Sequence, residues 1–589
     1  MRNTLNKLIY MCALLLASEQ LFAMQLVVAD DASKPLATVM VTQRLVAPSA
    51  LNLSDDGYPP NGVSNVAALE STRFTDDQGL VTFPDGGDGY RYRLRKPGYK
   101  DLQLPSSGSR VEVQMARELD PVALAAQKPA NVWLSQLELG GGPELRKHFF
   151  LNCAFCHQQA SPFMRVERTP DQWLEIIDRM GVYGARIAGD LRQPLADGLA
   201  SGYAKLNAND DKLPAARTWD AELATASYRE WPIGDGFSQM HDFILHPNGM
   251  VYVGDNLQDR IYEVNPNNGQ YTVYKVPHEE DDKLGGFLGN RFKAYGKLNN
   301  YMGVHSFAVS PKDGHIFITP SMQRALLEFD PHTKTFTSHP MKHGFYPHTI
   351  RTDTEDRVWF TLALSSQVAM FDRVSKEFTY YDIPPRNFKE WLTIKVLPLI
   401  FYINPEYRPM PSVDRESSGL PMPYGIDVAP DGRVWFARLY ANDIGFIDPQ
   451  SGELTMIDVS VNGPRRLRVD ADNKVWMVAF QDGLLAKYDP ELGVLTQYEL
   501  PLRSEIPYAL NVDRERRAVW VNGNQSDTIL RFDIDAETWQ VYPMSRQRTF
   551  TRDIEIAEDG SVFTSNSHFP SWQIEDAQPT LIHIQPYAQ

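Results

Sequence analysis

A repeated pattern in the second half of the chain decides its fold. Two of the clearest copies are Pro347-His348-Thr349-Ile350 followed by Arg357-Val358-Trp359-Phe360, and Pro423-Tyr424-Gly425-Ile426 followed by Gly432-Arg433-Val434-Trp435-Phe436. In each copy a proline opens one apolar run, and a Val-Trp pair marks the next run after a turn. Period-2 runs of β-branched and aromatic residues separated by turns are typical of short β-strands.

The repeat recurs seven times, and we mark each copy by the residue after its first proline or by the equivalent position. The markers are His241, His305, His348, Tyr424, Arg465, Tyr508 and Arg552. Uninterrupted copies are 41 to 44 residues apart, and the two longer intervals of 64 and 76 residues each contain an insertion. A period of about 40–45 residues with four strands is typical of a propeller blade, whereas β-solenoid repeats are shorter. The pattern predicts a seven-bladed β-propeller over residues 239–589.

The second insertion, residues 385–421, is strongly apolar for a loop. A lid over the channel, contact with a membrane or partner, and local packing are all compatible with it. Local packing is the simplest interpretation, and the segment is too short to span a bilayer.

The sequence Cys153-Ala154-Phe155-Cys156-His157 carries the most specific chemistry in the chain. Two thiols at this spacing can form thioethers with the two vinyl groups of one haem, and the adjacent imidazole then serves as the proximal iron ligand. A redox disulfide or half of a zinc site are the alternatives. The former is typical of a βαβ context and the latter needs two further ligands nearby, and neither pattern is present. We predict one covalent haem c in a small helical domain over residues 135–207.

The distal haem ligand is predicted on the next helix. Thr169 and Pro170 form an N-terminal helix signal, and Trp173, Ile177 and Met180 then share one helical face up to Gly181. This segment resembles short single-haem cytochrome c domains, in which a tryptophan-containing helix carries an Arg-Met pair. The resemblance favours Met180 as the distal ligand. An ordinary core methionine, Met164, His148 and an open site are the alternatives.

The N-terminus is typical of an export signal. Basic residues precede an apolar run at 8–17, which is too short for a transmembrane helix, and Ala23 is a plausible cleavage position. We therefore predict a signal peptide over residues 1–23 and a periplasmic protein without a transmembrane helix; an uncleaved anchor is the alternative. Cleavage removes Cys12, so the mature chain would keep only the two haem cysteines and no disulfide.

Residues 24–115 are predicted to be a β-domain. Their turn signals and alternating strands, including Lys34-Pro35, Asp77-Gln78-Gly79 and Lys96-Pro97-Gly98, resemble the carboxypeptidase regulatory-like β-sandwich. Arg91, Arg93 and Arg95 share one strand face, which is either a solvated surface, the more usual case, or a docking site for an acidic partner. Residues 116–134 and 208–238 are predicted to be linkers.

The composition excludes several classes of protein. Hydrophobic residues make up 43% of the chain, enough to fill cores, so general disorder is excluded. The net charge is −16 with no basic block, which argues against nucleic acid as a partner. No glycine-rich loop lies in a βαβ context, which argues against a nicotinamide or flavin site.

The propeller repeat resembles the streptogramin (virginiamycin B) lyase family. That resemblance implies that the marker residues face one mouth of the channel, where the family uses two histidines on consecutive blades, a glutamate two residues before the second, and a divalent ion. His305 and His348 match the histidines, but Tyr346 occupies the place of the glutamate. Histidines that only cap strand ends are the alternative. The marker set as a whole would form a polar mouth for an anionic or phenolic ligand or a metal.

These features together predict a periplasmic haem c protein with electron-transfer activity. It would be a redox enzyme or the partner of a periplasmic dehydrogenase or cytochrome, with the propeller binding a small-molecule substrate or that partner. Streptogramin-type carbon–oxygen lyase or hydrolase activity in the propeller is one alternative. A non-catalytic scaffold that carries the haem is the other.

Overall fold

The computed structural model describes residues 23–45, 60–66, 69–86, 89–105, 108–289, 295–404 and 420–586. Apart from Ala23, the predicted signal peptide and its Cys12 lie outside the described residues.

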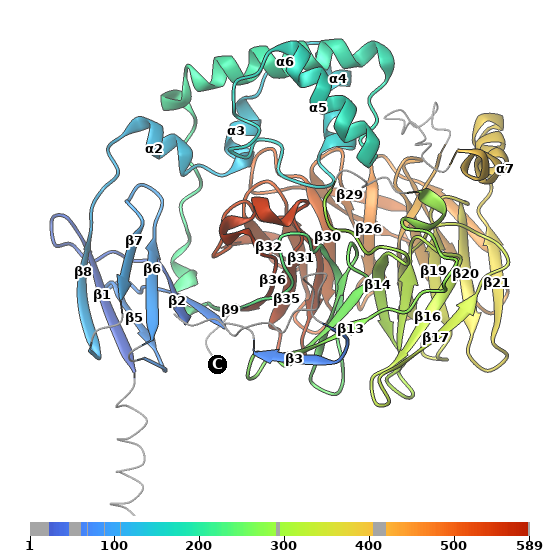
Figure 1. Cartoon of the computed structure of the whole chain (residues 1–589). Coiled ribbons are helices and arrows are strands. Elements are labelled where there is room, and N and C mark those ends of the chain that lie inside the picture. The colour runs from blue at the N-terminus through green and yellow to red at the C-terminus, as the bar shows by residue number, and fades with distance from the viewer. Residues whose placement is uncertain are drawn as a thin grey trace, which may run out of the picture.

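Most of the chain forms a ring of seven four-stranded antiparallel units, each running from an inner to an outer strand (Figure 1). The inner strands are β10 (Met240–Leu245), β14 (Val304–Val309), β18 (Pro347–Thr352), β22 (Pro423–Val428), β26 (Pro464–Val469), β30 (Pro507–Asp513) and β34 (Thr551–Ile556). The second strands are β11 (Val251–Asp255), β15 (Ile316–Pro320), β19 (Val358–Leu362), β23 (Val434–Arg438), β27 (Val475–Ala479), β31 (Ala518–Gly523) and β35 (Val562–Asn566). The third strands are β12 (Arg260–Val264), β16 (Ala325–Asp330), β20 (Gln367–Asp372), β24 (Asp443–Ile447), β28 (Leu484–Asp489), β32 (Thr528–Asp533) and β36 (Thr580–Gln585). The outer strands are β13 (Gln270–Lys275), β17 (Thr335–Pro340), β21 (Glu377–Asp382), β25 (Leu454–Asp458), β29 (Val494–Glu499), β33 (Thr538–Pro543) and β9 (Ser227–Pro232).

Neighbouring inner strands lie side by side around the ring, and β34 returns to β10. The prediction of a mainly β, propeller-like fold is therefore confirmed. Apolar side chains of adjacent units pack face to face, with buried tryptophans at the same repeat position: Trp359, Trp435, Trp476 and Trp520.

The last unit is completed by a strand from before the repeat. β9 pairs with β36 from Ser227↔Gln585 to Pro232↔Thr580. The outer strand of the seventh unit thus comes from residues 227–232, inside the segment predicted to be a linker over 208–238. The propeller-like part begins earlier than residue 239, because the ring closes by joining distant segments of the chain.

The N-terminal strands form two sheets over one core. β5 (Leu80–Phe83), β1 (Met24–Asp30) and β8 (Arg110–Met115) form the first sheet. β4 (Glu70–Phe74), β2 (Met40–Leu45), β6 (Tyr90–Arg95) and β7 (Leu102–Pro105) form the second, and β4 also pairs with β9. β3 (Val63–Val66) joins the outer edge of the first unit beside β13.

Two of the three arginines on the face of β6 are not solvated, contrary to the more usual case for such a strand; Arg91 is exposed. Arg93 donates a hydrogen bond to Glu575 at 2.9 Å, and Arg95 donates to both oxygens of the same carboxylate. Glu575 lies in the segment before β36. The acidic partner of this arginine face is therefore the last unit of the same chain.

Helices lie along one face of the ring, except α2, which lies above the N-terminal strands (Figure 1). They are α2 (Pro121–Ala126), α3 (Ala130–Gln136), α4 (Gly142–Cys153), α5 (Pro170–Tyr183), α6 (Gly189–Asn207) and α7 (Phe388–Ile403). α2 and α3 occupy the predicted linker 116–134. α5 has the predicted capping box, but it continues past Gly181 to Tyr183, and Gly184 ends it with φ 115°.

The apolar insertion forms α7, which packs locally. Its buried Leu397 and Phe401 contact a cluster that includes Met322, Phe345 and Leu364 of the neighbouring units. Within the part of the chain that the structure describes, every helix is too short or too polar to span a bilayer.

Candidate functional site

The seven marker residues lie at one position in the fold. Each is the second residue of an inner strand, so the ring brings residues more than 300 positions apart into one circle. A β-bulge follows this position in most of the inner strands, where the register shifts before the fourth residue. All seven side chains are buried: His241, His305, His348, Tyr424, Arg465, Tyr508 and Arg552. We call this set the channel ring.

One half of the channel ring consists of three histidines. The His241 and His305 ring centroids are 3.9 Å apart, and those of His305 and His348 are 4.0 Å apart. Burial lowers the pKa of His241 to about 4 and holds those of His305 and His348 well below their usual value. At neutral pH this histidine half therefore presents uncharged imidazoles.

The other half consists of two tyrosines and two arginines. The Tyr424 and Tyr508 hydroxyl oxygens are 3.0 Å apart, Arg465 donates to Tyr424, and Arg552 donates to Tyr508 at 2.6 Å. Burial raises the pKa of Tyr424 well above its usual value. Burial also acts to raise that of Tyr508, but Arg465 and Arg552 outweigh it, and the pKa of Tyr508 is lowered. This tyrosine-arginine half therefore carries two arginines, and their charge lowers the pKa of one of its phenols.

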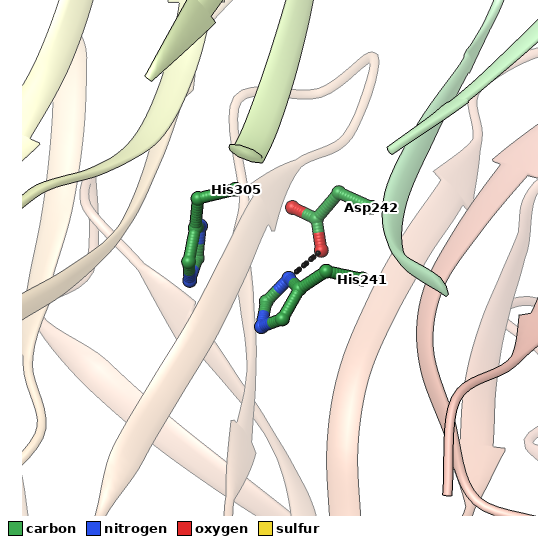
Figure 2. Close-up of side chains that lie close together, drawn as sticks. All are labelled: His241, Asp242 and His305. Carbon is green, nitrogen blue, oxygen red and sulfur yellow. Dashed lines mark hydrogen bonds and ion pairs between the residues drawn. The ribbon is translucent and has the colours of Figure 1, made fainter. Parts of the chain in front are cut away.

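A charged layer lies directly beneath the ring. Arg466 donates to both oxygens of Asp242 and to Asp553, each at 2.8 Å, and all three side chains are buried. Asp242 also bonds the Nδ1 atom of His241 at 2.9 Å (Figure 2). Burial acts to raise the pKa of Asp242, but Arg466 outweighs it and keeps the carboxylate ionised. The repeat pattern did not reveal this layer, because its residues follow the markers and share no residue type.

Three groups in this region have the chemistry of metal ligands. His241, Asp242 and His305 each offer one ligand atom, and these atoms lie within 4.8 Å of one another (Figure 2). However, both Asp242 oxygens already accept hydrogen bonds from the buried guanidinium of Arg466, whose charge would repel a cation nearby. The donor set as arranged fits a hydrogen-bonded cluster better than a divalent metal. His348, the second histidine expected from the lyase resemblance, lies outside this group.

The cysteine motif lies across the tyrosine-arginine half. The Phe155 ring lies beneath the Arg465 guanidinium carbon at 4.3 Å from its centroid, and Arg552 donates to the Phe155 carbonyl oxygen at 2.8 Å. Tyr508 and Phe480 belong to the same apolar core as the helices α4 to α6. The haem-type motif and the channel ring, which the sequence presents as two separate sites, are therefore in direct contact.

The residues after the motif fix it to the propeller loops. Gln158 donates to the Asp527 carboxylate at 2.7 Å and to the Thr549 carbonyl at 2.9 Å. The backbone N–H of Gln159 donates to the Gln525 side chain at 2.8 Å. Both glutamines are buried. These contacts hold the turn after α4 in one position relative to the ring.

The motif itself has the features that a c-type haem needs. Cys153, the last residue of α4, and Cys156 are both free thiols, and both are half-buried. The Nδ1 atom of His157 lies 3.1 Å from the Gln158 carbonyl oxygen, which accepts its proton and leaves Nε2 with a lone pair for a metal. Cys156 packs against an apolar cluster of Leu257, Tyr295 and Phe569. The residues present therefore fit a covalently attached haem.

The candidate distal ligands from the sequence lie in different environments. Met180 is half-buried near the end of α5, whereas Trp173 and Ile177 on the same helix are buried. Met164 is partly buried against the helical core, and His148 is buried on α4. A further histidine, His568, lies beside His157 with the ring centroids 5.9 Å apart. The sequence interpretation missed His568 because it is not at the marker position of its repeat unit and is far from the motif in the sequence.

Tyr346 occupies the structural neighbourhood where the lyase resemblance would require a carboxylate. Its ring centroid is 6.3 Å from that of His305 and 5.7 Å from that of His348. A phenol therefore stands where the lyase family places its acid–base carboxylate.

Comparisons with known proteins bear on the propeller alone. Residues 412–569 match the virginiamycin B lyase family. No curated protein matches the chain. A virginiamycin B lyase from Staphylococcus aureus is 14% identical with a TM-score of 0.46, over 61% of this chain and 99% of that one. A streptogramin B lyase structure is 15% identical with a TM-score of 0.46, over 61% and 98%. YCF48 bound to a D1 peptide is 10% identical with a TM-score of 0.42, over 62% and 97%.

The family match begins just before β22 and ends just after β35, so it covers most of the last four units of the ring. In that stretch the chain is similar to the virginiamycin B lyase family.

Proposed function

We propose that the chain is an exported electron-transfer protein that carries one haem c on Cys153 and Cys156, with His157 as the proximal ligand. The observation that supports this most strongly is the contact between the motif and the channel ring. Phe155, between the two cysteines, packs on Arg465 and accepts a hydrogen bond from Arg552. A chance occurrence of the motif in the sequence would not be expected to contact the mouth of the propeller in this way.

The residues of the motif have distinct roles in this proposal. Cys153 and Cys156 would hold the haem through one thioether each, and His157 would ligate its iron. When bound, a haem c supplies a single-electron redox centre. The carbonyl of Gln158 keeps the His157 imidazole in the tautomer that binds iron, and the buried glutamines keep water from one side of the turn.

The propeller would then bind the electron donor or the redox partner. Its channel ring combines neutral imidazoles with two buried arginines, a combination suited to a phenolic or anionic small molecule. The alternative binding partner is a periplasmic dehydrogenase or cytochrome that docks over the helices. In both cases Tyr508 is the ring tyrosine best suited to act as a proton acceptor, because its pKa is lowered.

The test of this proposal is the absorption spectrum of the protein in both redox states. The full chain is expressed with its signal and with haem-attachment machinery, and the Cys153→Ser/Cys156→Ser variant serves as the comparison. We expect a c-type spectrum that persists after denaturation in the wild type and is lost in the variant. A wild-type protein without covalent haem would overturn the proposal.

Lyase or hydrolase activity in the propeller is the second candidate, favoured by the family match over residues 412–569 and by the adjacent His305 and His348. It requires turnover of a streptogramin-type lactone and a bound divalent ion. Two results together would support it. The wild type would bind a divalent ion and catalyse the elimination, and both His305→Ala and His348→Ala would lose that activity. The carboxylate missing at Tyr346 and the Arg466–Asp242 pair weigh against it. If the protein is only a scaffold that carries haem, we expect the haem to be reversibly reducible and no small molecule to act as its electron donor.

A further inference from the structure

We propose that His568, in the last propeller unit, binds the haem iron on the face opposite His157. This inference rests on the haem c of the proposed function and adds the identity of the distal ligand. It assigns that role to the propeller rather than to the helical segment, where the sequence predicts Met180.

His568 is held against the cysteine motif by the backbone. It follows β35, and its neighbour Phe569 donates an N–H hydrogen bond to the Cys156 carbonyl oxygen at 2.9 Å. The His568 side chain is fully buried, at 0% exposure. The buried imidazole of His568 therefore belongs to the residue next to Phe569, which is hydrogen-bonded directly to the motif. The two segments are more than 400 positions apart in the sequence.

The two imidazoles have the separation expected for axial ligands of one metal. The ring centroids of His157 and His568 are 5.9 Å apart, and the ring planes are inclined by 25°. Offset-stacked rings also have centroids at this separation, so the proposal rests on the distance together with the nitrogen partners described below. Two imidazoles on opposite sides of one ion, with metal–nitrogen bonds of about 2 Å, have ring centres roughly 6 Å apart.

Both imidazoles are also in the tautomer that a metal requires. The Nδ1 atom of His568 lies 3.2 Å from the Pro570 carbonyl oxygen, just as Nδ1 of His157 faces the Gln158 carbonyl. A carbonyl accepts only a proton, so each ring carries its hydrogen on Nδ1 and a lone pair on Nε2. A backbone partner for the non-ligating nitrogen is the usual support of a metal-bound histidine.

The Nε2 atom of His568 has no hydrogen-bond partner among the described residues, although it is buried. A buried polar atom left without a partner is unfavourable and needs a reason. Coordination of iron would satisfy it.

The surroundings suit a porphyrin. Phe569, Tyr295 and Leu257 form a buried cluster beside Cys156, with Tyr183 of α5 packed against it. An apolar wall of this kind excludes water from a flat macrocycle and favours its burial. The cluster joins propeller residues to the end of α5, so the haem would lie between the two parts of the molecule.

The identity of the distal ligand has a measurable consequence. A methionine ligand raises the haem potential relative to a histidine ligand. With His568 bound, the ferric wild-type protein should give the electron paramagnetic resonance spectrum of a low-spin bis-histidine haem. It should lack the near-infrared charge-transfer band that arises from methionine on ferric iron. This measurement uses the unaltered protein and needs no variant to fold.

Three variants complete the test: His568→Ala, His568→Met and Met180→Leu. Covalent haem content is measured first in each, by the spectrum of the denatured protein in alkaline pyridine. We expect His568→Ala to keep its haem but become high-spin, and to return to a low-spin bis-imidazole spectrum when imidazole is added. We expect His568→Met to raise the midpoint potential and Met180→Leu to leave the wild-type spectrum unchanged.

The opposite pattern would overturn the inference. If the wild type shows methionine ligation, or if His568→Ala stays low-spin while Met180→Leu becomes high-spin, Met180 is the ligand and the haem proposal stands. A high-spin wild type with covalent haem would mean an open site and would also exclude His568. If the wild type carries no covalent haem, both the inference and the proposed function fail.

Discussion

The two halves of the channel ring occupy equivalent places in the repeat but differ in chemistry and in what covers them. The histidine half stacks three neutral imidazoles at centroid distances of 3.9 and 4.0 Å. The tyrosine-arginine half is linked by hydrogen bonds between its arginines and tyrosines, and it receives the cysteine motif through Arg465 and Arg552. Among the described residues, the Nε and Nη1 atoms of Arg465 and the Nε atom of Arg552 are nevertheless buried without a hydrogen-bond partner.

This difference indicates that one half of the channel ring supports the fold and that the other half can bind a ligand. Arg465 contacts Phe155, Phe480 and Tyr508 at once, with its guanidinium 3.5 Å from the Tyr508 ring centroid. Such a residue is committed to holding the helical segment in place. The histidines are not engaged in this way, and the His305 Nδ1 atom is buried without a hydrogen-bond partner among the described residues. The histidine half is therefore the part of the ring that contributes less to holding the helical segment, and it keeps an unpaired nitrogen for a ligand.

The largest effect is expected from the layer beneath both halves. Arg466→Met leaves Asp242 and Asp553 buried without their cation, which costs about 3–5 kcal/mol when one partner of a buried ion pair is removed. Denaturant unfolding measures this loss. Arg433→Met, which removes a more exposed pair with Asp431, is the matched control and should cost less than about 1 kcal/mol. Equal losses in the two variants would contradict a charged layer that organises the ring.

The tyrosine-arginine half should be more sensitive than the histidine half at neutral pH. Arg465→Met removes the donor to Tyr424 and the cation between Phe155 and Tyr508, and we expect a loss of about 3 kcal/mol. His305→Gln removes a neutral imidazole with an unpaired nitrogen, and we expect about 1 kcal/mol. The same unfolding experiment at pH 7 ranks the two. The reverse order would show that the histidine half is the structural one.

The histidine half should dominate the acid sensitivity of the protein. The pKa of His241 is about 4 in the fold against 6.5 in an unfolded chain, so the unfolded state binds the proton more tightly. This contribution is therefore complete above pH 6.5 and is lost as the pH falls toward 4. For His241 alone, the loss between pH 7 and pH 5 is about 2 kcal/mol.

Unfolding free energies at pH 7, 6 and 5 measure this slope. His241→Gln should flatten it, whereas a substitution of the exposed His332 should leave it unchanged. A variant with the wild-type slope would mean that the fold does not lower the pKa of His241.

A modest effect is expected where the motif turns onto the propeller loops. Gln158→Ala removes two hydrogen bonds, to Asp527 and Thr549, and leaves a buried carboxylate with its remaining partners from Thr549. We expect a loss of about 1–2 kcal/mol and faster proteolysis of the turn after α4. Unchanged proteolysis together with unchanged stability would show that the motif does not depend on this contact.

The sequence predicted the parts of the fold that depend on local periodicity. All seven marker residues occupy the same place in the inner strands, because the repeat records strand pairing between neighbours in the chain. The closing strand β9 was not predicted, since its partner β36 is about 350 residues away and the pairing leaves no local pattern. The strand β3, which adds a fifth strand to the first unit of the ring by pairing with β13, was missed for the same reason.

In the candidate site, too, local features could be predicted from the sequence and contacts between distant segments could not. The cysteine motif is a local signal and could be recognised in the sequence, as could the ring positions. Its contact with Arg465 and Arg552, and the approach of His568 to His157, depend on how the helices lie over the ring. The arginine face of β6 is a further example, because its partner Glu575 comes from the far end of the chain.

The mass of the intact protein, purified from cells that attach haem to exported proteins, tests the central claim most directly. The account predicts a mature chain heavier than its sequence by the mass of one haem, and a Cys153→Ser/Cys156→Ser variant at the mass of the polypeptide alone. A wild-type mass equal to the polypeptide, or lower by the two hydrogens of a Cys153–Cys156 disulfide, would contradict the account.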